Sequence, residues 1–343
     1  MRITLAQRFA EHHTGTHHPE RPERIEAFIA GLEAGGCPRT DLQPATPAPL
    51  PAILSVHGAA YVAGVERICL GLASDDIAEL PTGDTIVSRS SYEIALEAAG
   101  AALTAAEQST AGDPTLAITR PPGHHATPDR GMGFCIFNNI AIAAEQMRRN
   151  AGPVIVADFD YHHGNGTQAW VERELRLGDG PPIGFISSHA YPAYPGSGAF
   201  AESRIGESGF IIDVPLPLST VTDDFIAVWA SLLPPLVRRL RPAALLVSAG
   251  FDFLAGDPIA GLPVSLRAVD ALCALFGSVA SERGIALSFI FEGGYSLENL
   301  TASGASMART FNDGQSRATH APGAGEPASP KLRAIVREVL SWL

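Results

Sequence analysis

Short apolar runs alternate with helical patterns through most of this chain, and this alternation constrains the fold more than any other feature. The runs are apolar on both faces, as strands buried inside a parallel sheet are. Repetition of strand, helix and strand implies an α/β fold with a mostly parallel central sheet and helices on both faces. The predicted strands span 115–119, 153–160, 183–188, 209–216, 243–250 and 285–294. The predicted helices span 20–34, 90–108, 136–149, 221–240, 263–283 and 331–342.

The connections between these elements indicate a single domain over residues 1–343. That length would also allow two domains of about 150 residues each. However, neither break in the pattern has the length and composition of a linker between domains. The Pro-rich stretch near 38–51 is predicted to be a surface connection, and 312–330 is predicted to be a flexible loop.

The composition favours a large core and excludes several classes of protein. Hydrophobic residues make up 46% of the chain and charged residues 17%, which excludes global disorder. No run approaches the ~18 apolar residues of a membrane span, and the N-terminal segment lacks a secretion signal. A net charge of −12 without a basic run argues against nucleic-acid binding. The cysteines form no CxxC pair, so we expect neither a disulfide scaffold nor a cysteine zinc site. Free cysteines are typical of a reducing compartment, and we therefore expect a cytoplasmic location.

Titratable side chains follow four of the predicted strands. His124 and His125 follow one strand, and the segment DFDYHHGNGTQ (158–168) begins at the end of the next. Asp252 and Tyr295 follow two later strands. In open parallel sheets, ligands bind outside the carboxyl ends of the strands. We therefore expect these side chains to form one functional site.

Three of these side chains are predicted to bind a divalent metal ion. Alternate side chains of an extended segment share a face, so Asp160 and His162 can hold one ion, with Asp252 as the third ligand. This set suits zinc, with iron, cobalt or manganese as alternatives, and it leaves a position open, as catalytic sites do. A lone Asp-x-His would instead be interpreted as a turn cap and a packed histidine.

Two histidines and a tyrosine could transfer protons and stabilise charge beside that ion. Gly123 precedes His124 and His125, so both rings can approach one point, as a general base and as an acid or electrostatic stabiliser. Tyr295 follows two glycines that permit a sharp turn, and its hydroxyl could donate to an oxyanion. Without a metal, each would be interpreted as an ordinary loop residue.

Five motifs stand in the chain in this order: HHTGTHHPERPERI (12–25), RPPGHHA (120–126), DFDYHHGNGTQ (158–168), SAGFDFLAGDP (248–258) and EGGYSLEN (292–299). These motifs resemble the histone deacetylase family of zinc amidohydrolases, closest to its class II and bacterial branch. That family belongs to the arginase and deacetylase superfamily and also includes the acetylpolyamine amidohydrolases. The resemblance implies the arginase/deacetylase-like fold, with Asp160, His162 and Asp252 as the ligands of one Zn²⁺ (Fe²⁺ or Co²⁺ as alternatives).

The resemblance also implies catalytic roles. His125 would be the general base, and His124, hydrogen-bonded to Asp158, would stabilise charge and could protonate the leaving amine. Tyr295 would donate to the oxyanion. Asn165 stands where class I enzymes have an aspartate behind the base, and it should raise the pKa of that histidine less than a carboxylate would.

Further residues are implied at the substrate tunnel. Gly133 and Phe134 would line the acyl-lysine tunnel, with Tyr194 as the opposite wall. Asp84 falls where the family has an aspartate that holds the substrate backbone. Ile259 stands where a polyamine-selective member has a glutamate.

The resemblance finally implies an internal acetate channel at Arg21 and a structural K⁺ site near the zinc. The segment after GTQ departs from the family pattern, which puts a second potassium site in doubt. The implied potassium ligands are Asp158, the carbonyls of Asp160 and His162, and Ser187 or Ser188.

The expected function is removal of acetyl or other acyl groups from N-acetylated amines, such as acetyl-lysine in a peptide or a small molecule. The alternative is an acetylpolyamine or small-amide hydrolase of the same fold, although Ile259 weakens the polyamine interpretation. A two-manganese arginase-like enzyme would need further carboxylates, and a non-catalytic acyl-lysine binder would not need Tyr295. We expect no membrane or nucleic-acid partner and leave homo-oligomer formation open.

Overall fold

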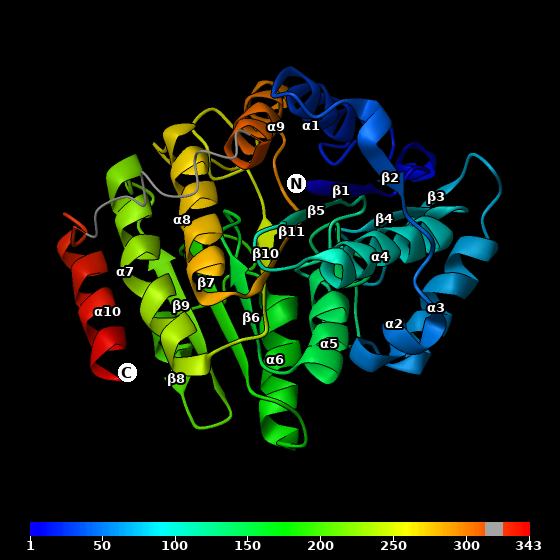
Figure 1. Cartoon of the computed structure of the whole chain (residues 1–343). Helices are drawn as coiled ribbons and strands as arrows, with labels where there is room; N and C mark the ends of the chain where they lie inside the picture. The colour runs from blue at the N-terminus through cyan, green and yellow to red at the C-terminus, as the bar shows by residue number, and fades with distance from the viewer. Residues whose placement is uncertain (313–324) are drawn as a thin grey trace.

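A single large sheet forms the centre of the computed structural model, which describes residues 1–312 and 325–343 (Figure 1). Within these residues the sheet has nine strands in the order β2-β1-β5-β11-β10-β6-β7-β9-β8. All neighbours are parallel except β8 and β9. The strands are β1 (Arg2–Leu5), β2 (Leu42–Pro44), β5 (Thr115–Ile118), β6 (Val154–Asp158), β7 (Ile183–Ala190), β8 (Arg204–Ile205), β9 (Gly209–Leu216), β10 (Ala244–Ala249) and β11 (Ala286–Phe291). A separate antiparallel pair joins β3 (Ile77–Glu79) and β4 (Ile86–Ser88).

Helices cover both faces of this sheet, as the alternating pattern predicts (Figure 1). One face carries α2 (Leu50–Val56), α3 (Ala59–Leu70), α4 (Ser91–Gln108), α5 (Asn139–Ala151) and α6 (Asn165–Leu177). The other carries α1 (Glu23–Ala34), α7 (Thr222–Leu240), α8 (Arg267–Arg283), α9 (Leu297–Asn312) and α10 (Pro330–Ser341). None of the helices in the described residues combines the length and hydrophobicity that crossing a bilayer requires.

Two hydrophobic cores result, one on each face of the sheet. In β6, Ile155 and Ala157 pack into the core with α7 and α8, whereas Val154 and Val156 pack into the core with α4 and α5. All four side chains are fully buried. Because successive strand residues point to opposite faces, a strand covered on both sides needs an uninterrupted apolar run.

The structure confirms the α/β architecture and the positions of the predicted elements, with end shifts of a few residues. The prediction omitted several elements, among them β1 at the N-terminus and α6 and α9, which begin inside the motif segments. The Pro-rich stretch 38–51, predicted to be a surface connection, also contains the short strand β2, which pairs with β1. The loop predicted over 312–330 lies mostly outside the described residues.

Helices α1 and α9 approach closely through glycines. A Cβ atom added at Gly31 would lie 2.0 Å from the carbonyl oxygen of Thr301, and one at Gly304 would lie 2.4 Å from that of Phe28. Backbone atoms cannot move aside as a flexible side chain can. This contact fixes α9, and with it the turn of Tyr295 that precedes α9.

Replacing Gly31 by alanine is therefore expected to force α1 and α9 apart. We expect Gly31→Ala to lower the free energy of unfolding by roughly 1–3 kcal/mol, the usual cost of overpacking, measured by urea titration. Gly64→Ala in α3 is the matched control, because a Cβ there meets nothing within 4 Å. That variant should be neutral or stabilised by about 0.5–1 kcal/mol. Equal effects of both substitutions would contradict the close-packing explanation.

Candidate active site

The four strands that carry the predicted site are neighbours in the sheet, in the order β5-β11-β10-β6. All four run parallel, so their carboxyl ends meet at one edge. The segments that leave this edge carry His124 and His125 after β5, Tyr295 after β11, Asp252 after β10, and the motif beginning at Asp158 after β6. The sheet order thus brings together residues that lie far apart in the sequence.

Asp160, His162 and Asp252 form a group with metal-ligating geometry. One donor atom from each lies within 4.8 Å of the others. Nδ1 of His162 is 3.0 Å from Oδ2 of Asp252 and 3.3 Å from Oδ1 of Asp160, and both aspartates are fully buried. The group needs a glycine at position 250, because a Cβ there would lie 1.8 Å from Oδ2 of Asp160.

The charge balance of this group fits a cation. Burial raises the pKa of Asp252 to about 6, and the charge of Asp160 adds to that rise. Burial alone would lower the pKa of His162, but hydrogen bonding to the two aspartates outweighs burial and raises that pKa to about 10. Two carboxylates and one imidazole are also a donor set that zinc and related ions accept. These residues therefore fit the metal that the sequence predicts.

His124 and His125 lie against each other in opposite electrostatic environments. Their ring centroids are 4.0 Å apart. Burial would lower the pKa of His124, but the charges of Asp160 and Asp158 outweigh it and raise that pKa to about 10. Burial, together with the charges of His124 and His162, lowers the pKa of His125 well below its usual value. In many active sites, an acid and a base are two neighbouring groups whose surroundings shift their pKa values in opposite directions.

Each of these two rings has one partner that orients it. Nδ1 of His124 is 3.1 Å from Oδ2 of Asp158, and Nδ1 of His125 is 2.7 Å from Oδ1 of Asn165. Nδ2 of Asn165 donates to the sulfur of Met132, which identifies Oδ1 as the atom that faces His125. Nδ1 of His125 therefore carries the proton, and Nε2 is left with a free lone pair.

A cavity of about 270 Å³ opens onto this group. Phe134 reaches it with a left-handed backbone (φ 69°), following Gly133 (φ 57°). A Cβ at Gly133 would lie 2.3 Å from Cδ2 of His125, so only glycine fits there. The hydroxyl of Tyr194 donates to Asp84 across 2.6 Å. The cavity is lined by Asp84, His125, Gly133, Phe134, His162, Tyr194, Ile259 and Tyr295, which includes every residue assigned to the substrate tunnel.

Tyr295 lies at the inner end of α9 in a fixed turn. Its backbone N–H donates to Oδ2 of Asp257 across 2.7 Å, and the guanidinium of Arg24 lies 4.8 Å from the centre of its ring. Arg24 is fully buried and donates to the carbonyl of Gly294. Burial raises the pKa of Tyr295 well above its usual value, so the phenol keeps its proton at neutral pH.

Sequence reasoning missed some of these supporting residues. Asp257, Glu292 and Arg24 all stand inside quoted motifs, yet the residue types alone gave no role. Oε2 of Glu292 accepts from the backbone N–H groups of Gly123 and His124, which holds the histidine pair against β11. Their position inside these motifs, beside residues with predicted roles, was the sequence feature that could have identified them.

Arg21, Ser187 and Ser188 lie away from the cavity. Arg21 is exposed and lines a different hollow near the N-terminal loop, whereas Arg24 is the buried arginine beside the site. Ser187 is beside Asp158 in the sheet register, and Ser188 accepts from Trp229. Their roles in an acetate channel and in potassium binding remain predictions.

Comparison with known proteins agrees with this geometry. The histone deacetylase domain matches residues 18–311. Histone deacetylase 10, chloroplastic, of Oryza sativa subsp. japonica is 35% identical over 320 residues, covering 87% of this chain and 70% of the relative. The histone deacetylase-like amidohydrolase of Pseudomonas aeruginosa is 35% identical over 288 residues, covering 81% and 73%. The solved structure of acetylpolyamine aminohydrolase from Burkholderia pseudomallei has a TM-score of 0.77 at 27% identity, covering 90% and 99%.

The matched domain spans most of the chain and contains both aspartates, both histidine pairs and the tyrosine of the site. The fold and the arrangement at the sheet edge are those expected from the motifs. The chain therefore belongs to the histone deacetylase family of amide-cleaving hydrolases.

Proposed function

We propose that this protein is a zinc-dependent amidohydrolase that removes acetyl or other acyl groups from N-acylated amines, with acetyl-lysine as the main substrate class. The observation that carries the proposal is the cavity of about 270 Å³, whose wall contains His125, His162 and Tyr295 together. Asp160, His162 and Asp252 would hold the ion. Zinc bound there would polarise the amide carbonyl and activate water for attack.

In this proposal His125 accepts the proton of the attacking water. Its low pKa keeps the ring neutral, and Asn165 holds the Nδ1 proton so that Nε2 can act as the base. A neutral amide side chain orients the ring without adding a charge that would keep it protonated.

His124 and Tyr295 act on the departing amine and on the oxyanion, respectively. The charges of Asp160 and Asp158, together with the hydrogen bond to Asp158, keep His124 protonated, so it can supply a proton to the departing amine. Tyr295 keeps its phenol proton and can donate it as a hydrogen bond to the oxyanion that forms at the carbonyl. No covalent bond between the protein and the acyl group is needed.

An acetylpolyamine is the second candidate substrate. Asp84 brings a carboxylate to the cavity, where it could attract a cationic amine, and the Burkholderia structure is that of an acetylpolyamine aminohydrolase. Two observations favour acetyl-lysine instead. Asp84 is already engaged by Tyr194, and the cavity lining next to it includes the apolar Ile259.

Metal-reconstituted turnover on different substrates tests the proposal. An acetyl-lysine peptide, N-acetylputrescine and N-acetylspermidine should be compared at equal protein and zinc concentrations. We expect the peptide to have the highest kcat/KM. A preference for the acetylated polyamines would select the second candidate, and no turnover on any of the three with zinc bound would contradict deacetylation.

Removing the Tyr295 hydroxyl should reduce turnover without removing the metal. We expect Tyr295→Phe to lower kcat by about 10²–10³-fold, as the loss of one oxyanion donor does. The metal content, measured by mass spectrometry, should stay unchanged. Full activity of this variant would show that the phenol does not act on the oxyanion.

Adding one methyl group beside His125 should displace the base. We expect Gly133→Ala to lower kcat by about 10²-fold, because a small misplacement of a catalytic group has an effect of that size. Gly196→Ala is the matched control: Gly196 also has a positive φ (87°), but a Cβ there meets nothing within 4 Å. If both variants lose the same activity, backbone strain and not contact with His125 is the cause.

The partners and location remain predictions as well. We propose a cytoplasmic enzyme that acts on small-molecule or peptide amides without a nucleic-acid partner. K⁺ at Asp158, Asp160, His162 and Ser187 or Ser188 is proposed as a structural ion.

A further inference from the structure

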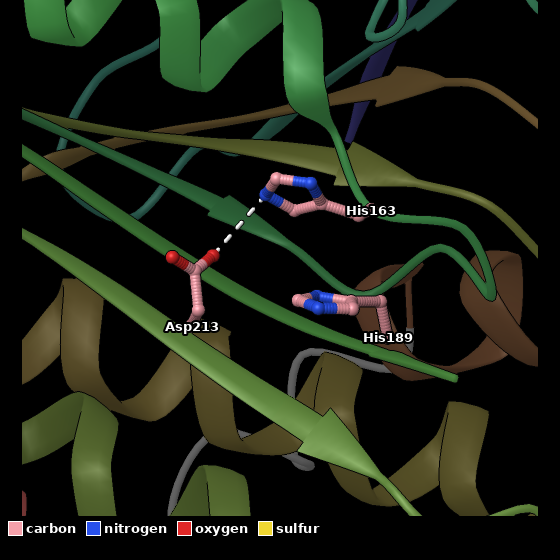
Figure 2. A group of neighbouring side chains, drawn as sticks. All are labelled: His163, His189 and Asp213. Atoms are coloured by element: carbon pink, nitrogen blue, oxygen red, sulfur yellow. Dashed lines mark ion pairs between the residues drawn. The ribbon is translucent and has the colours of Figure 1, made fainter. Parts of the chain in front are cut away.

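A second group of metal-ligating side chains lies on the strands beside the active site (Figure 2). His163 directly follows the zinc-ligand candidate His162, His189 is on β7, and Asp213 is on β9. One donor atom from each lies within 4.8 Å of the others, and all three residues are buried. Across residues 1–312 and 325–343, this group and the one at the active site are the two that meet this geometry.

Asp213 is the member that most needs a partner. It is fully buried, and neither of its carboxylate oxygens accepts a hydrogen bond. Oδ1 is 3.2 Å from Nε2 of His163, but the two atoms do not form an aligned hydrogen bond, and Oδ2 has no partner. A buried carboxylate in this state is costly unless a cation or several donors compensate its charge.

The outer hydrogen bonds of the two histidines match those of metal ligands. Nε2 of His189 donates to the carbonyl of Gly198 across 2.8 Å, which puts the lone pair on Nδ1. The hydroxyl of Ser187 donates to this nitrogen across 2.9 Å and would have to turn away for Nδ1 to bind an ion. Nδ1 of His163 is 2.9 Å from the hydroxyl of Ser197, so Nε2 can face Asp213. Histidines that bind metals usually hold their second nitrogen in such a bond, because it fixes the tautomer and the ring orientation.

Gln168 provides a fourth donor atom of fixed identity. Its Nε2 lies 3.2 Å from a carboxylate oxygen of Glu202 and 3.4 Å from one of Glu172, and it donates to both. Its Oε1 therefore faces the group, 2.9 Å from Nε2 of His163. Two imidazoles, one carboxylate and one amide oxygen, all buried, correspond to the closed four-ligand arrangement of structural zinc sites.

We propose that His163, His189 and Asp213 bind a divalent transition-metal ion of the zinc class, with Oε1 of Gln168 completing a structural site. The competing arrangement has no ion: Nε2 of His163 is hydrogen-bonded to Gln168, and Nδ1 of His189 to Ser187. That arrangement leaves both carboxylate oxygens of Asp213 without a donor, whereas a metal ion places a positive charge among all three side chains. The proposal does not depend on the reaction at the active site.

Such an ion would hold the segment that carries Tyr194 into the cavity. A Cβ at Gly198 would lie 2.3 Å from Nε2 of His189 and 2.7 Å from Cγ of His163, so the backbone of this segment packs closely against both rings. His163 is also covalently next to His162. The second ion would thus join β7, β9 and the start of α6 directly behind the site.

Metal content per chain tests the proposal. The protein and its variants should be loaded with excess zinc, desalted and analysed by mass spectrometry. We expect about two equivalents in the original chain, about one in Asp252→Ala, about one in Asp213→Asn and about none when both are combined. Asp224→Asn is the matched control, because Asp224 is a buried aspartate outside both groups, and it should keep about two.

The separate variants distinguish this site from the active site. Loss of all metal in Asp252→Ala, with unchanged content in Asp213→Asn, would overturn the second site and leave the first intact. If Asp213→Asn does not fold, thermal unfolding of Asp252→Ala gives the answer. Zinc should raise its melting temperature, because an ion that binds only the folded state stabilises it. No rise would also overturn the proposal.

Discussion

The burial of two carboxylates at the ends of adjacent strands is the constraint on which the rest of the site depends. Asp160 and Asp252 stand just after β6 and β10, fully removed from water, and the charge of one or both acts on His124, His162 and Tyr295. Both hold His162 toward the charged form, and Asp160 together with Asp158 does the same for His124. Burial and the charges of these two histidines hold His125 neutral. One electrostatic arrangement thus explains why two adjacent histidines differ so strongly in pKa. It also explains why a divalent cation fits among the three ligand side chains.

The fold provides this arrangement through sheet order and a rigid support. Hydrophobic cores pack against both faces of the sheet, and this packing holds the strand ends in fixed positions. Beneath the site, the fully buried Glu20 accepts from both Arg24 and Arg120, at 2.8 and 2.9 Å. Arg24 also holds the carbonyls of Glu292 and Gly294, which fixes the turn before Tyr295. Removing one partner of such a buried ion pair would leave a charge without compensation, so Glu20, Arg24 and Arg120 are needed together.

The sequence predicts the parts of this account that depend on local pattern. Apolar runs locate the strands, and the polar residues after them locate the site, because chemistry at the carboxyl ends of parallel strands is a general property of the fold class. Contacts between residues far apart in the chain cannot be predicted from local sequence pattern. Burial of Arg24 instead of Arg21 depends on the packing of α1 against α9, and the roles of Asp257 and Glu292 depend on which backbone N–H groups reach them. His189 and Asp213 belong to no local motif, and only the pairing of β7 with β9 brings them to His163.

The most direct test of the account is anomalous diffraction at the zinc absorption edge, from crystals of the zinc-loaded protein. We predict an anomalous peak within about 2.0–2.2 Å of one oxygen of Asp160, one oxygen of Asp252 and Nδ1 of His162, at the floor of the cavity lined by His125 and Tyr295. A fully occupied zinc ion bound elsewhere, with no peak among these three side chains, would contradict the central claim that the buried carboxylates hold the ion that activates the substrate.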